Sequence, residues 1–555
     1  MSWQRRGSTM LVGGVAGLLA ASCMLLVMAA GRTWLGISPL PEAVPDRIAP
    51  TLSIREFFDL FGKYGGYNGL KKFGITTGIQ AVIGVGVVTG LLYTLLAESR
   101  WARRRGAWRL GISRVGAVTI ALVAALVWGG TLVFLRPVLQ TNYRGLPPNQ
   151  ARFVMAAGLL VTYAVFAVVL VVAYHGITWR KTAPTLHTVE PGSEGSGAQG
   201  AQRPVSAPVG APSTRRAILA LGVGGLAAWP TYALVKRLYD GAVFSYDGQV
   251  YNGPGVQPLV PNDKFYTVTK NVVDPNVSRH LWGLQIGGLV DREHVYGFDE
   301  LAGMPSIDQE STLMCISNRI GSGLASNAVW TGVRMADLLK AAGVREGAVE
   351  VKLYGADGYT DTFSIEKALD PTTLVVYLMN GEPLPERHGY PVRVVVPGLY
   401  GEKNVKWITG IEVLDHDGKG FYEEQGWGPN FVIPTRSDFF SPRWQRTSKG
   451  DFFSDTFARA KPVQLRGRAF AGDRGIASVE VSVDGGGTWS PATIDYAGTR
   501  LTWVFWSYRW TPAMSGTFDL VVRATDGKGQ LQTSDVRGTA PQGATGLHRV
   551  VATVA

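Results

Sequence analysis

The chain has 555 residues, of which 46% are apolar and 10% aromatic, so it can fill several domain cores and is not a disordered chain. Its formal net charge is +12, from 54 Lys and Arg against 42 Asp and Glu. Much of this basic excess flanks apolar runs instead of gathering on one polar stretch, which argues against a nucleic-acid binder.

Four long apolar runs with almost no charged residues lie in the N-terminal third, at 9–30, 74–97, 115–135 and 153–174. Each is long enough to cross a hydrocarbon layer of about 30 Å as a helix. A fifth run, 217–235, is shorter and contains Pro230. The sequence therefore predicts an N-terminal, all-α membrane region of about five helices.

The basic residues beside these runs predict their orientation. The loop after the second run carries Arg100, Arg103, Arg104, Arg105, Arg109 and Arg114. The positive-inside rule places this loop, and with it the N-terminus, in the cytoplasm. Because successive spans cross the membrane in alternating directions, everything after about residue 236 then lies outside. We expect a multi-pass protein of the cytoplasmic (inner) membrane, in contact with its lipid, with its C-terminal half on the outer face.

Residues 182–214, between the fourth and fifth runs, are rich in Pro, Gly, Ala and Ser and show no periodicity. Such a composition buries too little apolar surface to fold, so we expect a disordered linker. Arg215 and Arg216 follow it directly and precede the fifth run. The pair is similar to a twin-arginine export signal placed inside a chain, although two topology-setting arginines would look the same.

After residue 237 the pattern changes to short β-type runs separated by Gly, Pro and Asp turns. Strands are predicted near 281–290, 349–356, 372–379, 391–398 and 407–415. The stretch "RMADLLKAAGV" has helical spacing and a stop at Gly343. An α+β domain is predicted to about 430, and the alternating strands beyond it predict an immunoglobulin-like sandwich.

Cys315 is one of only two cysteines, and the other, Cys23, lies in the first apolar run, so a disulfide between them is excluded in practice. Three roles remain open from chemistry alone. The thiol could be a small buried hydrophobe, a nucleophile that needs a histidine base, or a single thiolate ligand to a metal. In the last case an organic cofactor would have to supply the other sulfur ligands, because no further Cys or His lies nearby.

The residues around Cys315 and in a second loop favour a large anionic cofactor. Asn318, Gly321 and Gly323 form a polar loop with few side chains, which a bulky group can approach. Further along, a Gly-rich turn gathers basic side chains of the kind that hold a phosphate: His388, Arg393, Lys403 and Lys406. A solvated basic loop would have the same composition.

Four stretches in this order, "TLMCISNRIG", "WTGVRMADLLKAAG", "YLMNGEPLPERHGYPVRVVVPGLYG" and "VKWITGIEV", resemble the molybdopterin-binding domain of the sulfite oxidase family, of the membrane-anchored bacterial type. The tail, with "IASVEVSVDGGGTWSPA", is similar to that family's immunoglobulin-like dimerisation domain. The resemblance covers roughly residues 255–540.

The domains expected on this basis are a membrane domain with four helices (1–181), the linker (182–214), a twin-arginine-like motif with the fifth helix (215–236), a molybdopterin-binding oxidoreductase domain (237–430) and an immunoglobulin-like domain (431–555).

The resemblance implies that Cys315 is the protein's only ligand to molybdenum, with one pterin dithiolene per chain supplying two more sulfurs. A soft thiolate suits such a sulfur-rich site. Contacts to the pterin or its phosphate are implied for Asp263, Tyr266, Thr267, Asn318, Asp357, His388, Arg393, Asn404, Val405 and Lys406.

The substrate end departs from the family pattern. Sulfite-oxidising members have an arginine and a histidine after the "FYTV"-like strand, where this chain has Lys270 and Asn271. They also have a tyrosine beyond the phosphate loop, where this chain offers Trp427. Arg319 could supply one cation to an anion pocket. Cys315, Arg319, Lys270 and Trp427 are therefore the candidate catalytic residues, and sulfite is not secure as the substrate.

The resemblance implies an enzyme that moves an oxygen atom to or from a small sulfite-like or S-/N-oxide substrate. No haem-attachment motif occurs, so electrons would pass to an external carrier, a cytochrome or a quinone system. No nucleic-acid partner is expected, and a homodimer is allowed. The alternative is a five-span transporter or receptor with a soluble ligand-sensing domain, but the apolar runs hold almost no ionisable residues for a transport path. A relative that kept the fold and lost catalysis would not need Cys315.

Overall fold

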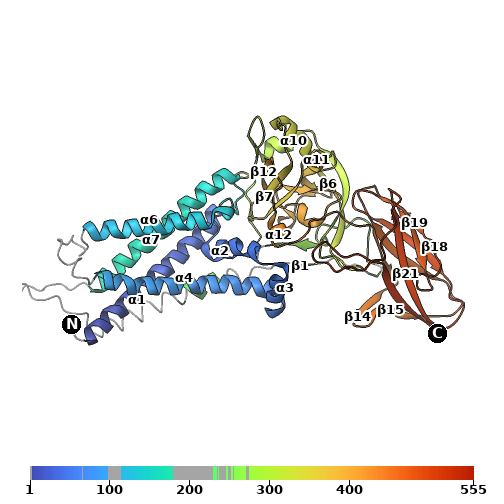
Figure 1. Ribbon diagram of the computed structural model, residues 1–555, viewed down its shortest axis with the longest axis horizontal. Coiled ribbons are helices and arrows are strands. Elements are labelled where there is room, and N and C mark those ends of the chain that lie inside the picture. Colours follow the sequence, from blue (N-terminus) through green and yellow to red (C-terminus); the bar gives the residue numbers. More distant parts are fainter. Residues whose placement is uncertain are drawn as a thin grey trace, which may run out of the picture. The chain divides into compact units, whose positions relative to one another are not determined.

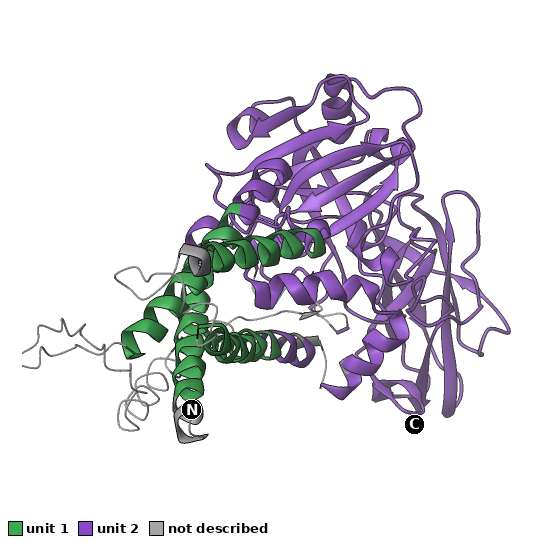
Figure 2. Cartoon of the chain, turned by 60° about the vertical axis from the view of Figure 1, so that its left-hand side comes forward, with its two compact units in different colours: residues 1–30, 76–134, 157–238 green, residues 31–75, 135–156, 239–555 purple. Residues whose placement is uncertain are grey.

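The computed structural model describes residues 3–64, 67–97, 114–178, 229, 231–233, 235–236, 246–247, 252–253, 255–270 and 274–555. The chain divides into two compact units, one of residues 1–30, 76–134 and 157–238 and one of residues 31–75, 135–156 and 239–555 (Figure 2). The linker, the Arg215–Arg216 pair and nearly all of the fifth apolar run lie outside the described residues.

The first unit is helical. It contains α1 (Trp3–Ala30), α6 (Arg114–Phe134) and most of α4 (Tyr67–Ala97) and α7 (Pro148–Thr178) (Figure 1). Among the described residues, three helical stretches are long and apolar enough to cross a membrane: Thr9–Leu35, Lys72–Ala97 and Pro148–Thr178. The apolar part of α6, Val118–Phe134, is shorter. Helices over the first four apolar runs are thus confirmed.

Helices α1 and α4 meet at glycines spaced four residues apart. A Cβ atom on Gly17 would lie 2.1 Å from the carbonyl oxygen of Gly86, and one on Gly90 would lie 2.0 Å from that of Gly13. Only glycine permits this approach, which lets the two backbones touch as small residues do in membrane helix pairs. Val12, Ala16 and Ala20 of α1 pack against α7 beside this crossing.

The first part of the second unit is a β-rich domain with two five-stranded sheets. One sheet has the order β4-β3-β12-β7-β8, with bounds β3 (Gly283–Gly288), β4 (His294–Gly297), β7 (Glu350–Gly355), β8 (Thr360–Ser364) and β12 (Ile408–Leu414). The other has the order β10-β9-β6-β5 with β11 paired to β9, and bounds β5 (Ile307–Met314), β6 (Ala325–Arg334), β9 (Leu374–Met379), β10 (Glu382–Pro383) and β11 (Arg393–Val395).

The helices of this domain are short: α9 (Phe298–Ala302), α10 (Met335–Ala342), α11 (Ile365–Leu369) and α12 (Phe421–Glu424). Helix α10 ends, as predicted, at Gly343, whose φ of 72° is left-handed. Its Leu338 and Leu339 are fully buried in the same core as Leu284 of β3 and Ile411 of β12. All five predicted strands are present. A two-residue pair, β1 (Tyr246–Asp247) and β2 (Thr267–Val268), lies outside the two sheets.

The C-terminal part is a β-sandwich. A four-stranded sheet has the order β13-β16-β20-β19, with bounds β13 (Arg436–Ser441), β16 (Val463–Phe470), β19 (Thr493–Tyr496) and β20 (Val504–Trp510). A six-stranded sheet has the order β14-β15-β22-β21-β17-β18, with bounds β14 (Trp444–Thr447), β15 (Gly450–Phe457), β17 (Ile476–Ser482), β18 (Ser490–Pro491), β21 (Gly516–Asp526) and β22 (His548–Val554). The predicted sandwich is confirmed, and its immunoglobulin-like topology stays a prediction.

The segments that join the membrane-type helices belong to this second unit. The first of these segments, residues 31–75, begins with a short π-helical turn (Gly31–Leu35). It continues with α2 (Leu40–Ile48), a 3-10 turn (Ala49–Thr51) and α3 (Ile54–Lys63). The amide of Ile54 donates to the carbonyl of Gln425 (3.1 Å). In the 135–156 segment, which holds a 3-10 turn (Arg136–Val138), the amide of Asn142 donates to Ala356 (3.1 Å). Both segments are therefore hydrogen-bonded to the β-rich domain.

Candidate functional site

A cavity of about 640 Å³ lies beside Cys315 in the second unit. Its lining includes most of the residues predicted for the site: Tyr266, Thr267, Lys270, Cys315, Arg319, Asp357, His388, Arg393, Asn404, Val405, Lys406 and Trp427. These residues come from the strand ends and loops of the β-rich domain. The fold thus brings predicted residues that lie up to about 160 positions apart in the sequence to one cavity.

Cys315 directly follows β5 and is buried. Its amide donates to the carbonyl of Leu324 (2.9 Å), and its Sγ lies 3.1 Å from the hydroxyl of Ser317. Burial raises the pKa of the thiol to about 11, so without a metal it is protonated and a poor nucleophile at neutral pH. A bound metal cation would remove the proton, which favours the ligand role over the nucleophile role.

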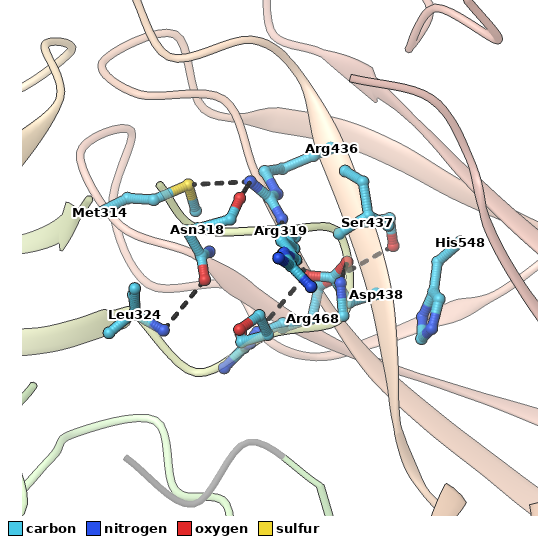
Figure 3. A network of polar contacts seen from close by, with 12 residues as sticks. Met314, Asn318, Arg319, Leu324, Arg436, Ser437, Asp438, Arg468 and His548 are labelled. Atoms are coloured by element: carbon cyan, nitrogen blue, oxygen red, sulfur yellow. Dashed lines mark hydrogen bonds and ion pairs between the residues drawn. The ribbon is translucent and has the colours of Figure 1, made fainter. Parts of the chain in front are cut away.

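The loop that carries Cys315 is held by buried polar side chains of the sandwich domain (Figure 3). Arg436 donates to the carbonyls of Asn318 (3.2 Å) and Arg319 (2.9 Å). The carboxylate of Asp438 accepts from the amide of Gly321 (2.7 Å), and Arg468 donates to the carbonyl of Ser322 (2.7 Å). We call Arg436, Asp438 and Arg468 the sandwich clamp.

The sandwich clamp is also a charge network. Asp438 lies 3.8 Å from both Arg436 and Arg468, and all three side chains are almost fully buried. Burial acts to raise the pKa of Asp438, but the two guanidinium groups outweigh it and hold the pKa below its ordinary value. The carboxylate is therefore charged at neutral pH, and it orders the two arginines that contact the loop.

The basic end of the cavity is formed by His388, Arg393 and Lys406. The Nε2 atom of His388 lies 3.0 Å from the carbonyl of Asn262, and burial, reinforced by the charges of Arg393 and Lys406, lowers its pKa to about 3. Burial also lowers the pKa of Lys406 to about 8. This end thus combines a neutral imidazole with two cations held close together, an arrangement that suits a phosphate.

Several buried donors in this region lack an internal hydrogen-bond partner. Among the described residues they include Nδ2 of Asn318, Nε of Arg393 and Nε1 of Trp427, and in the sandwich clamp Nε of Arg436 and Nη1 of Arg468. Buried N–H groups are rarely left unsatisfied unless a ligand takes their hydrogen bonds. Together with one thiol at the other end, the donor set fits a polar, phosphate-bearing cofactor that also brings a metal.

The remaining predicted residues differ in what they contribute. Asp357 accepts from the amide of Tyr359 (3.0 Å) and is buried in the wall. Asn404 uses both ends of its amide internally, accepting from Val396 (2.7 Å) and donating to Tyr400 (3.0 Å). It therefore shapes the phosphate loop through the backbone. Tyr266, Thr267 and Val405 are buried in the lining.

Three residues predicted near the cofactor are not part of the cavity lining: Asn318, which is buried in the loop after Cys315, Asp263 and Lys403. The side chain of Asp263 is 73% exposed, 3.5 Å from Lys264, and is not part of the cavity lining. Lys403 is buried in ion pairs with Asp361 (2.6 Å) and Glu423 (3.2 Å), also outside the lining. Gly401, Glu402 and residues 404–407 line the cavity, whereas Lys403 is held in the core by its two carboxylate partners.

At the substrate end, Lys270 is buried and paired with Asp46 of α2 (3.1 Å). Arg319 is exposed at the rim. Trp427 is buried, with its ring 6.1 Å from that of Phe58 in α3 and 6.2 Å from that of Tyr422. All three predicted side chains therefore reach the cavity, but the charge of Lys270 is neutralised by its neighbour.

Sequence reasoning missed several lining residues. Phe57 and Phe58, which are half-buried and exposed respectively, come from the segment between two predicted spans, where only the amphipathic stretch "IREFFDLFGK" could have signalled a packing face. Glu402 lies between two of the quoted stretches, beside Lys403, but nothing in the sequence shows the direction of its side chain. Both of its carboxyl oxygens are buried without a hydrogen-bond partner among the described residues, and burial raises its pKa to about 8.

Comparison with known proteins agrees with this geometry. Residues 271–422 match the family described as "Oxidoreductase molybdopterin binding domain", and residues 449–542 match the "Mo-co oxidoreductase dimerisation domain". The uncharacterized oxidoreductase YuiH of Bacillus subtilis is 36% identical over 146 residues, which cover 26% of this chain and 72% of YuiH. The chain belongs to the sulfite oxidase family of molybdopterin-dependent oxidoreductases.

Other relatives share only part of their length with this family member. The NADH nitrate reductase of Solanum lycopersicum is 29% identical over 309 residues, 45% of this chain and 34% of that protein. The chain thus spans about a third of this reductase. The sulfane dehydrogenase SoxCD of Paracoccus pantotrophus has a structure that aligns with a TM-score of 0.47 at 20% identity, covering 68% of this chain and all of that one.

Family membership makes this chain an enzyme and a molybdopterin oxidoreductase.

Proposed function

We propose that this enzyme is a membrane-anchored molybdenum-cofactor oxidoreductase that transfers an oxygen atom to or from a small substrate, sulfite-like or an S- or N-oxide, on the outer face of the cytoplasmic membrane. The observation that carries the proposal is the cavity that joins one buried thiol, Cys315, to buried N–H donors without internal partners. One molybdenum-bound pterin dithiolene per chain would give the Cys315 thiol a metal to bind and would give the buried N–H donors acceptors.

In this proposal the residues of the cavity bind and orient the cofactor. Cys315 is the protein's sulfur ligand to molybdenum, and Arg393, His388 and Lys406 hold the pterin and its phosphate. The bound cofactor supplies two-electron oxygen-atom transfer. The protein keeps the site in a largely buried cavity, so that its charges act on the substrate in a low dielectric. Asn318, whose Oδ1 accepts from the amide of Leu324 (2.9 Å), holds the shape of the loop that carries Cys315.

The packing of three segments supports their lying on one side of the membrane, and the positive-inside rule makes that side the outer one. In the predicted topology, residues 31–75, 135–156 and everything after 236 lie on the same, outer side of the membrane. These same three segments form one compact unit and are hydrogen-bonded to each other, for example from Gly283 to the carbonyl of Gly145 (3.2 Å). A topology with one of them on the opposite side would have to break these contacts.

Electrons would be exchanged one at a time with an external carrier, a cytochrome or a membrane quinone system. A homodimer formed through the sandwich domain is also proposed, because residues 449–542 match a dimerisation domain.

Replacing Cys315 by Ser tests the proposal. We expect turnover to be abolished while the protein folds and largely retains the pterin, because the contacts from Arg393 and Lys406 do not involve the thiolate. The measurements are oxygen-transfer rate, molybdenum content and pterin content of the purified full-length protein. A Ser variant with near-normal rates would show that Cys315 is not the ligand.

A further inference from the structure

The wall of the cavity at its substrate end includes a segment outside the family match. Helices α2 and α3 lie between the first two membrane-type helices, far before residue 271, where that match begins. Phe57 and Phe58 of α3 line the cavity, and Phe58 contacts Trp427. Gln425, two residues before Trp427, accepts from Ile54 through its carbonyl and donates through its side chain to the carbonyl of Ala49 (3.0 Å). The segment is therefore built into this wall.

The same segment changes the charge of the cavity. The ammonium group of Lys270 is 4% exposed and lies 3.1 Å from the carboxylate of Asp46 in α2, which is 18% exposed. It also lies 5.2 Å from the ring centre of Phe421. A buried lysine next to a carboxylate has little attraction left for a second anion, because its field is cancelled at short range.

The other charged groups of the lining do not restore an anion site. Arg446 is held by Asp451 through two hydrogen bonds (2.9 and 2.8 Å). Glu402 adds a buried carboxyl, which repels an anion if charged and offers it no cation if neutral. Arg393 and Lys406 serve the phosphate. Arg319 is exposed at the rim, where solvent screens its charge.

We propose that the segment 40–63 completes the substrate pocket and makes it selective for an uncharged S- or N-oxide that carries an apolar or aromatic group, in preference to oxyanions such as nitrate or sulfite. Asp46 is the specificity-determining residue, and Phe57, Phe58 and Trp427 form the apolar face for the substituent. This inference rests on the proposed function.

The reaction balances as the reduction of an oxide. For a sulfoxide, the S–O bond breaks, two electrons arrive one at a time from an external one-electron carrier, and two protons join the oxygen to form water. The product is the corresponding uncharged sulfide. Neither substrate nor product carries a charge, so neither needs a cation in the pocket.

The test compares two oxidants in the full-length enzyme in detergent, with reduced methyl viologen as electron donor. For the wild type we expect kcat/KM for methyl phenyl sulfoxide to exceed that for nitrate at least 100-fold. Asp46→Asn removes the negative charge beside Lys270 and should lower this ratio at least tenfold. Asp46→Glu keeps a carboxylate beside Lys270 and should have the ratio of the wild type. Asp59→Asn, an exposed carboxylate of α3 outside the lining, is the matched control and should leave the ratio unchanged.

A second variant keeps the test decisive if Asp46→Asn does not fold. Phe58→Ala should lower kcat/KM for methyl phenyl sulfoxide relative to dimethyl sulfoxide at least fivefold, since only the former carries a ring. The inference would be overturned by a wild-type enzyme that prefers nitrate. It would also be overturned by variants that change kcat/KM equally for the two substrates compared. Either result would leave the proposed oxidoreductase function standing. Wild-type protein without molybdenum and pterin would instead overturn the proposed function itself, and this inference with it.

Discussion

At the scale of single residues, the position of Cys315 depends on side chains more than 100 residues away. Arg436 donates to two carbonyls of the cysteine loop and, at 3.3 Å, to the sulfur of Met314 (Figure 3). In the proposed function Cys315 is the single protein ligand to molybdenum, so the loop backbone would have to fix the position of its thiolate. The sandwich clamp holds this loop together with contacts inside the loop, such as that from the amide of Leu324 to Asn318.

Arg436→Met keeps a long side chain but removes these hydrogen bonds. We expect kcat to fall at least tenfold, the molybdenum electron paramagnetic resonance signal to change, and stability to drop by about 2–4 kcal/mol, because loop carbonyls and Asp438 lose a buried partner. Arg466→Met, on the exposed side of β16, is the control for loss of an arginine. If stability falls but the spectrum and kcat do not move, Arg436 stabilises the fold without positioning the ligand.

At the scale of elements, the helical unit depends on the crossing of α1 and α4. Gly90→Leu would place a side chain against the backbone of Gly13, which cannot move away as a flexible side chain could. We expect a loss of at least ~3 kcal/mol, seen as a lower midpoint of thermal unfolding in detergent. Gly84→Leu is the matched control on the same helix, because a Cβ there meets nothing within 4 Å. Equal effects of the two substitutions would mean that the crossing is not a close backbone contact.

At the scale of the whole molecule, the proposed location requires the cofactor-binding unit to reach the outer face. In this family molybdopterin is inserted in the cytoplasm, so the domain should cross already folded, with Arg215 and Arg216 as the export signal. Changing both to Lys keeps the positive charge and removes the recognition pair. We expect the domain to stay inside, as judged by protease accessibility and metal content. A cofactor-loaded domain outside in the double variant would show that the two arginines only set topology.

Local sequence pattern determined much of the architecture. Apolar runs of about 20 residues indicated helices α1, α4, α6 and α7. Short β-type runs between Gly, Pro and Asp turns indicated β7, β9 and β12. Cys315, Arg393 and Lys406 could be predicted as site residues because they lie in stretches that resemble the family's motifs. These features are local, and each can be read in a window of a few residues.

Only the tertiary structure decided how charge and shape are distributed in the cavity. Asp46 meets Lys270, and Phe58 meets Trp427, across more than 200 residues of chain, and no local period records such a pair. Lys403 and Lys406 are equally basic in sequence, yet one is buried against Asp361 and the other lines the cavity. The physical reason is that a side chain's direction and its ionic partner follow from the packing of distant segments, which is settled when the chain folds.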